Sequence, residues 1–166
     1  MTDTAFLVDD TISGFESLQK AGKIRHWGVS NFDVDDMKEL FDLGGKAVAT
    51  NQVLYNLSRR GIEYDLLPWQ AQRSIPTMAY SPIEQGRLAG NRDLARIAEQ
   101  HGKTSAQIAL AFLLTRPDVI VIPKAGTVPH VKENAEAADI VLSADDLAAL
   151  DAAFPPPKRK SHLEMI

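Results

Sequence analysis

The stretch Val119-Ile120-Val121-Ile122-Pro123 places four β-branched residues in a row before a proline. Such a run is typical of a strand that is buried on both faces of a parallel sheet. Upstream of it, Thr104-Ser105-Ala106-Gln107 is a capping-box pattern, which predicts a helix that continues to the residues before Pro117. A helix that leads into a buried strand is the repeating element of parallel α/β proteins.

The rest of the chain alternates between helix and strand patterns in the same way. Apolar residues at helical spacing, with capping residues before them, predict the helices, and short β-branched or aromatic runs predict the strands. The expected helices span about 11–22, 33–43, 62–70, 92–100, 105–114, 129–138 and a segment after 143, and the expected strands span 23–30, 47–52, 75–80 and 119–123. Four strands separated by helices indicate a parallel α/β sheet, and the pattern alone leaves open whether the sheet is open or closed into a barrel.

Polar side chains follow the predicted strands, at the points where the strands end. They are Ser30, Asn31, Asn51, Gln52, Tyr80, Ser81 and Lys124. Because ligands bind at the carboxyl ends of strands in parallel α/β folds, we expect these groups to converge. Amides and hydroxyls can hold an amide-bearing ring, a tyrosine can stack on it, and a lysine beside a helix N-terminus can hold a phosphate. Each residue taken alone is explained as well by a turn or a core position, so the nucleotide site is inferred from their combination.

These segments resemble the aldo-keto reductase family in order and spacing. The matching motifs are Gly28-Val29-Ser30-Asn31-Phe32, Asn51-Gln52, Ala79-Tyr80-Ser81-Pro82 and Ile122-Pro123-Lys124. The resemblance implies the C-terminal half of a (β/α)8 TIM barrel, which is an eight-stranded fold. It divides the chain into an N-terminal extension (1–10), the half-barrel domain (11–154) and a Pro-rich basic tail (155–166) that we expect to be solvated. The runs 56–61 and 66–69 resemble the bacterial branch that reduces small aldehydes such as methylglyoxal.

By the same resemblance the chain binds NADP(H). Ser30, Asn31 and Gln52 would hold the nicotinamide carboxamide, and Tyr80 would stack on the nicotinamide ring. Lys124 matches the lysine that contacts the adenosine 2′-phosphate. The cofactor-binding residues that the resemblance implies are Ser30, Asn31, Gln52, Tyr80, Ser81, Ile83, Gly86, Arg87, Lys124, Ala125, Gly126, His130, Glu133 and Asn134.

Four of these residues concern the adenosine end of the cofactor. Glu133 and Asn134 match the pair that hydrogen-bonds the adenine. Ala125 and His130 stand where many members of the family have serine and arginine. Arginine offers a permanent bidentate fork to a phosphate, whereas histidine is charged only in part near neutral pH. We therefore expect weaker or pH-dependent selectivity for the 2′-phosphate.

The catalytic Asp, Tyr, Lys and His of the family belong to its first half, and no residue here matches them. We therefore predict no catalytic residue in this chain. Tyr55, Tyr64 and His26 are possible substitutes as the acid, and structural roles are preferred for Tyr55 and His26. Two functions remain open: an oxidoreductase half that reduces small aldehydes or ketones, and a catalytically inactive dinucleotide-binding or assembly module. Two open sheet edges and an uncovered barrel core predict either a homodimer of half-barrels or a fragment that needs a complementing N-terminal half.

Composition narrows the class of protein. The chain has 166 residues, of which 45% are hydrophobic and 24% charged, as in an ordinary single globular domain. It carries neither a membrane-spanning run nor a signal-like N-terminus, so we expect a cytoplasmic protein. The absence of cysteine and the scattered histidines argue against a metal site. A formal net charge of -4 argues against a broad nucleic-acid-binding surface.

Overall fold

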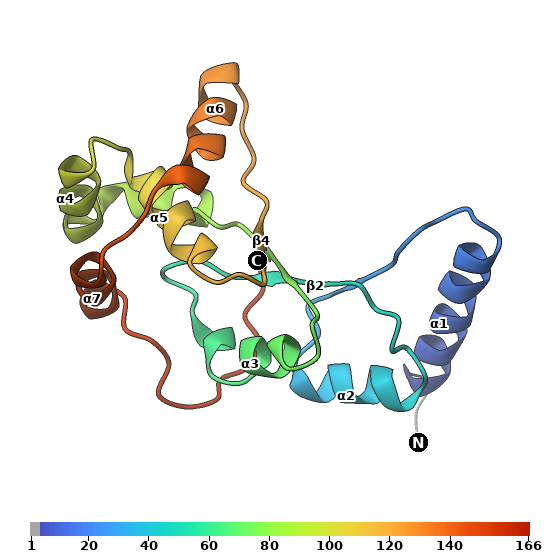
Figure 1. The fold of residues 1–166 in the computed structure, drawn as a ribbon. Helices are drawn as coiled ribbons and strands as arrows, with labels where there is room; N and C mark the ends of the chain where they lie inside the picture. Colours follow the sequence, from blue (N-terminus) through green and yellow to red (C-terminus); the bar gives the residue numbers. More distant parts are fainter. Residues whose placement is uncertain (1–3) are drawn as a thin grey trace.

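The computed structural model describes residues 4–166, in which helices surround a four-stranded sheet (Figure 1). All strand pairs are parallel, and the strand order is β1-β2-β3-β4. Each strand therefore pairs with the next one along the chain, as in a βα barrel, whereas the order reverses in a doubly wound sheet. The predicted α/β class is confirmed, and the sheet is part of a TIM barrel. The strands are β1 (Val29–Ser30), β2 (Asn51–Leu54), β3 (Thr77–Tyr80) and β4 (Val119–Val121).

The strand register separates two faces of the sheet, because side chains at one level of a parallel sheet point the same way. One level consists of Val29, Asn51, Thr77 and Val119, and the last three of these are buried. The next level consists of Ser30, Gln52, Met78 and Ile120. On this second face Ser30 is exposed and Ile120 is 45% exposed. The described residues thus leave one face of the sheet largely open.

All four predicted strands differ from the structure in their bounds, the first most of all, since it covers Val29–Ser30 rather than 23–30. The second begins at Asn51 rather than 47, because Val48 makes a turn hydrogen bond to Gly45 and the buried run Val53-Leu54 continues the strand. The prediction that the fourth strand is buried on both faces was wrong, since the side chains of Ile120 and Ile122 are 45% and 38% exposed. The physical reason is that β4 lies at the edge of the sheet and one face of the sheet is open.

The helices follow the predicted alternation, and capping side chains begin several of them. Thr104 forms the predicted capping box of α5, and Asp33 and Ser143, expected as capping residues of α2 and α7, form capping boxes as well. The first helix starts well before the predicted residue 11 and includes most of the segment predicted as an extension. The α-helices are α1 (Thr4–Lys20), α2 (Val34–Asp42), α3 (Leu66–Ala71), α4 (Arg92–Gln100), α5 (Ser105–Leu114), α6 (Val128–Glu136) and α7 (Ala144–Ala153). Three 3-10 helices are η1 (Gly61–Glu63), η2 (Glu84–Gly90) and η3 (Ala137–Asp139).

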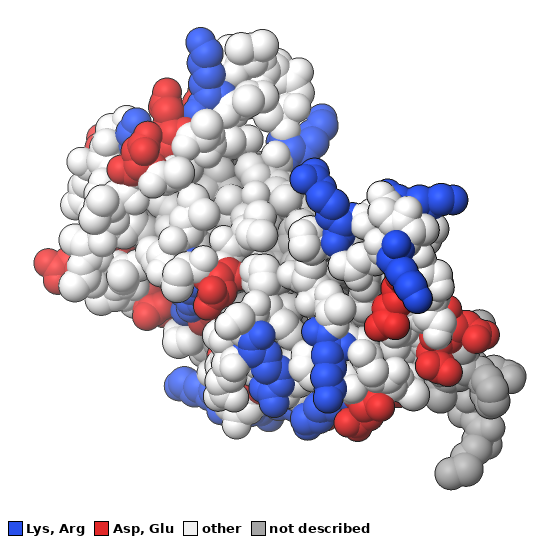
Figure 2. Space-filling model, turned by 45° about the vertical axis from the view of Figure 1, so that its right-hand side comes forward, with Lys and Arg blue, Asp and Glu red and all other residues white. Residues whose placement is uncertain are grey.

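The core centres on α5, which is buried over most of its length. Ile108, Leu110 and Leu113 are fully buried. Burial of each such side chain contributes roughly 1.5–3 kcal/mol. None of the helices in the described part of the chain has the length and hydropathy needed to cross a membrane. On the face drawn in Figure 2, basic and acidic side chains are interspersed around a large uncharged area.

Residues 155–166, the C-terminal tail, leave α7 and pass near α3 toward the strands (Figure 1). Most of their side chains are exposed, as expected for a solvated tail. The tail is nevertheless attached to the domain: Lys160 pairs with Asp35 at 3.1 Å, Glu164 pairs with Arg59 at 2.7 Å, and Leu163 packs against the core. This attachment was not predicted, because it joins residues about a hundred positions apart.

Candidate functional site

The structure gathers four of the predicted site residues, which lie on or directly after three neighbouring strands. A backbone hydrogen bond fixes the relative position of two of them: the Asn31 amide donates to the carbonyl of Gln52 at 2.8 Å. The Ser30 hydroxyl donates to the same carbonyl at 2.9 Å. From the third strand, the Tyr80 hydroxyl donates to Oδ1 of Asn31 at 3.1 Å. Asn31 has a positive φ of 57°, which turns the chain sharply at the end of β1.

Gln52 occupies the centre of this group and faces the open side of the sheet. It lies level with Ser30 and Met78 and is half-buried. Its side-chain Nε2 is 3.0 Å from the sulfur of Met78. Because β2 starts at Asn51, Gln52 is near the beginning of its strand rather than beyond its end. The amide, hydroxyl and ring groups of Gln52, Ser30 and Tyr80 thus belong to one polar surface that can hold an amide-bearing ring.

A cavity of about 490 Å³ lies beside this group and brings together six more predicted residues. The residues that line it are Ser81, Pro82, Ile83, Gln85, Gly86, Ile122, Lys124, Gly126 and His130. Of these described lining residues, two are basic and none is acidic. A Cβ added to Gly126 would lie 3.6 Å from Lys124 Nζ, so the ammonium is close to the Gly126 backbone.

The start of α6 adds to the positive character of this cavity. Thr127 caps the helix by accepting a hydrogen bond from the His130 amide at 3.4 Å, so the cavity residue His130 lies in the first turn. Backbone N–H groups at a helix N-terminus favour anions. Lys124, His130 and this helix end together suit a phosphate group. The residues present therefore fit a phosphorylated nucleotide.

Four predicted residues lie outside the lining of this cavity. Glu133 and Asn134 are half-buried and follow His130 along α6. The carbonyl of Glu133 accepts a hydrogen bond from Gln107 at 3.1 Å. Ala125 is half-buried between two lining residues, and the side chain of Arg87 is 68% exposed. The structure thus brings most of the predicted residues together and leaves these four at the margin.

Residues 81–90, here called the cavity loop, form a strained segment that contributes residues to the lining of the cavity. Ser81, Glu84 and Gln85 have positive φ angles of 48°, 47° and 54°, and Gly86 follows at 84°. A left-handed conformation costs roughly 1–2 kcal/mol for each residue with a Cβ. Such strain persists only where surrounding contacts hold it in place.

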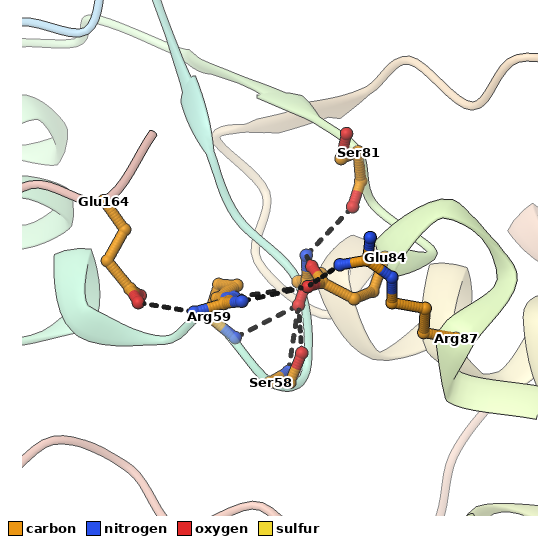
Figure 3. Close-up of polar contacts among 7 residues, drawn as sticks. Ser58, Arg59, Ser81, Glu84, Arg87 and Glu164 are labelled. Atoms are coloured by element: carbon orange, nitrogen blue, oxygen red, sulfur yellow. Dashed lines mark hydrogen bonds and ion pairs between the residues drawn. The ribbon is translucent and has the colours of Figure 1, made fainter. Parts of the chain in front are cut away.

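Asn56 is fully buried and forms hydrogen bonds with the cavity loop. Its Nδ2 donates to the Ser81 carbonyl at 2.9 Å and to Glu84 Oε2 at 2.7 Å. Arg59 also contacts the Glu84 carboxylate, with NH2 at 3.2 Å from Oε1 (Figure 3). Sequence reasoning missed these three residues as parts of the site. The one available signal was a glutamate in the segment after the third strand, together with an Asn and an Arg that follow the second strand.

Tyr55 belongs to a buried polar cluster behind the sheet rather than to the cavity. Its side chain is fully buried, and its hydroxyl donates to Glu63 Oε1 at 2.6 Å. Burial, followed by the nearby Glu63 charge, raises the pKa of Tyr55 far above its ordinary value. Arg60 and Arg116 contact the same carboxylate at 2.8 and 2.9 Å. Tyr55 therefore retains its proton and acts as a structural residue, in agreement with the role preferred from the sequence.

The comparisons with known proteins agree with this fold. Methylglyoxal reductase YeaE of Escherichia coli (strain K12) is 48% identical in an alignment of 168 positions, which covers 98% of this chain and 59% of that protein. Glyoxal reductase of Bacillus subtilis (strain 168) is 37% identical over 143 residues, or 86% of this chain and 51% of that protein. The chain thus spans between half and three-fifths of these relatives.

Solved structures are similar over nearly the whole chain. An aldo/keto reductase from Klebsiella pneumoniae, crystallised with NADP and acetate, has a TM-score of 0.95 and 48% identity and covers 99% of this chain and 60% of its own. A second Klebsiella pneumoniae structure, an aldo-keto reductase with NADPH, has a TM-score of 0.94 and 49% identity over 96% of this chain and 58% of its own. Residues 2–154 match the model of the aldo/keto reductase family. The chain belongs to the aldo/keto reductase family.

Proposed function

We propose that this chain supplies the NADP(H)-binding part of an oxidoreductase that reduces small aldehydes or ketones. The observation that carries the proposal is the cavity of about 490 Å³ in which Lys124 and His130 lie beside the start of α6. The cavity adjoins the strand-end group through Ser81, which follows Tyr80 directly. A phosphate site next to a surface for an amide-bearing ring suits a nicotinamide dinucleotide.

The residues divide by the part of the cofactor that each would hold. Ser30, Asn31 and Gln52 would bind the nicotinamide carboxamide, and Tyr80 would stack on the ring. The cavity loop would bind the pyrophosphate through Ser81, Ile83, Gly86 and Arg87. The 2′-phosphate would be held by Lys124, Ala125, Gly126 and His130, and the adenine by Glu133 and Asn134.

Bound NADPH supplies a hydride to the carbonyl carbon of its substrate. The resulting alkoxide needs a proton, and Tyr55 is unsuited to provide it because it is buried and bonded to Glu63. We therefore propose that the acid comes from outside this chain, from a complementing N-terminal half that also covers the open face of the sheet. A homo-oligomer of half-barrels is the alternative means of covering that face.

The names of the relatives support the substrate class. Proteins named methylglyoxal reductase and glyoxal reductase are 48% and 37% identical to this chain. We propose small dicarbonyl aldehydes as substrates and a cytoplasmic location. We further propose residues 11–154 as the family domain and residues 155–166 as its tail.

The burial of Tyr55 also supports a second candidate, a catalytically inactive dinucleotide-binding or assembly module. Two measurements on the same sample separate the candidates: the change in NADPH fluorescence on binding, and NADPH consumption with methylglyoxal. Binding with turnover supports the oxidoreductase. Binding without turnover, restored by adding the N-terminal half of a relative, supports the complemented enzyme. Binding that no added half converts to turnover supports the inactive module.

A further inference from the structure

Arg59 lies between the cavity loop and the C-terminal tail and contacts a carboxylate from each (Figure 3). Its NH2 and Nε are 3.2 and 3.3 Å from Glu84 Oε1 in the cavity loop. Its NH1 is 2.7 Å from Glu164 Oε1 in the tail. Because a guanidinium is rigid and planar, the position of one carboxylate restricts the position of the other.

The two contacts differ in burial. The side chain of Glu84 is 8% exposed, whereas those of Arg59 and Glu164 are 36% and 44% exposed. A buried carboxylate depends on its charged partner more strongly than an exposed one. The position of the buried Glu84 carboxylate therefore depends on the charge of Arg59, and Glu164 restrains the Arg59 side chain from the solvent side.

The carboxylate of Glu84 bonds to Asn56 and Arg59, while its neighbours Ile83, Gln85 and Gly86 line the cavity. Glu84 thus connects the strained backbone of the cavity loop to Arg59. The tail has other attachments, including Lys160 to Asp35 and Asp65, but among the described contacts Glu164 is the one that leads to the cavity loop.

We propose that Arg59 is a positioning residue that couples the cavity loop to the C-terminal tail. With Glu164 in place, Arg59 holds Glu84, and through it Gln85 and Gly86, in the conformation that receives the dinucleotide. The identity of the ligand rests on the proposed function, whereas the contact network does not. Because coupling between two sites is reciprocal, a bound dinucleotide stabilises the attachment of the tail by the same factor.

The test is the variant Glu164→Gln, which weakens the outer contact and changes no atom of the buried one. Two quantities are measured on the full chain: hydrogen exchange of the amides in residues 83–90, and the Kd for NADPH from fluorescence. Loss of one partly exposed ion pair is expected to raise both the exchange rates and the Kd about two- to fivefold. Arg59→Gln should have a larger effect, roughly tenfold or more, because it removes the closer of the two cations that pair with the buried Glu84 carboxylate and leaves only Arg87 NH1 at 3.9 Å among the described residues.

The matched control is Glu99→Gln, the same change at an exposed glutamate of α4 that has no ion pair in the described part of the chain. It should alter neither quantity. Reciprocity adds a second readout: saturating NADPH should slow carboxypeptidase digestion of the tail in the unaltered chain, and less so in Glu164→Gln.

The outcomes distinguish the coupling from the proposed function. If the unaltered chain binds no NADPH and Glu164→Gln still raises exchange in the cavity loop, the coupling stands and the proposed function fails. If NADPH binds and Glu164→Gln changes loop exchange and Kd no more than Glu99→Gln does, the coupling is overturned and the proposed function stands. Unchanged loop exchange in Glu164→Gln overturns the coupling whether or not NADPH binds.

Discussion

Asn56→Ala should destabilise the protein more than any exposed asparagine substitution, because Asn56 is fully buried and bonds in two directions. Its Nδ2 donates to Ser81 and Glu84, and its Oδ1 accepts from the backbone amides of Ser58 and Arg59 at 2.9 and 3.0 Å. Loss of a hydrogen bond to a charged group costs about 1.5–3 kcal/mol, and each neutral one about 1 kcal/mol. One bond to a charged group and three neutral bonds together predict a loss of roughly 4.5–6 kcal/mol in the free energy of unfolding.

Urea denaturation measures this loss, provided that the m-value is unchanged. The matched control is Asn91→Ala, since Asn91 caps α4 through one bond to the Leu94 amide at 3.0 Å. Removal of such a cap costs about 1 kcal/mol. The reasoning about the cavity loop would be refuted if Asn56→Ala cost no more than Asn91→Ala.

Four further predictions concern the cofactor, the buried cluster and acid stability. Lys124→Met should weaken NADPH binding about tenfold to 100-fold with little effect on NADH, as measured by fluorescence titration. His130→Arg should strengthen NADPH binding relative to NADH, as measured by the same titration, because arginine offers a permanent bidentate fork to a phosphate. Tyr55→Phe should lower the free energy of unfolding by about 1–3 kcal/mol and leave the NADPH Kd unchanged. Hydrogen bonds from Ser143, and to a lesser extent from His101, lower the pKa of Asp146 below its ordinary 3.8. The stability it contributes is therefore present above that value and lost as pH falls through the lowered pKa, so acid unfolding of Asp146→Asn should be less steep.

Local patterns predicted the elements and the polar strand ends well. The capping boxes at Asp33 and Thr104 depend on residues three positions apart, so the sequence displays them directly. Convergence of Ser30 and Gln52 follows from parallel pairing, which makes them register partners on neighbouring strands, although Gln52 lies near the start of its strand and not at the predicted end. These features needed no knowledge of distant contacts.

Long-range contacts account for what was missed. Glu84 is buried because Asn56 and Arg59 approach it from a loop about 25 residues earlier, and no local pattern indicates that approach. The contact of Glu164 with Arg59 spans 105 positions. Exposure of Ile120 was missed because β-branched composition favours a strand but does not say whether both of its faces are covered.

The measurement that tests the central claim most directly is the binding of NADPH and NADH to this chain, followed by cofactor fluorescence. The cavity beside Lys124 and His130 predicts saturable binding of NADPH with a Kd on the order of micromolar and weaker binding of NADH. Lys124→Met should remove most of this difference. A fluorescence signal that shows no saturation with either dinucleotide up to about millimolar concentration would contradict the account.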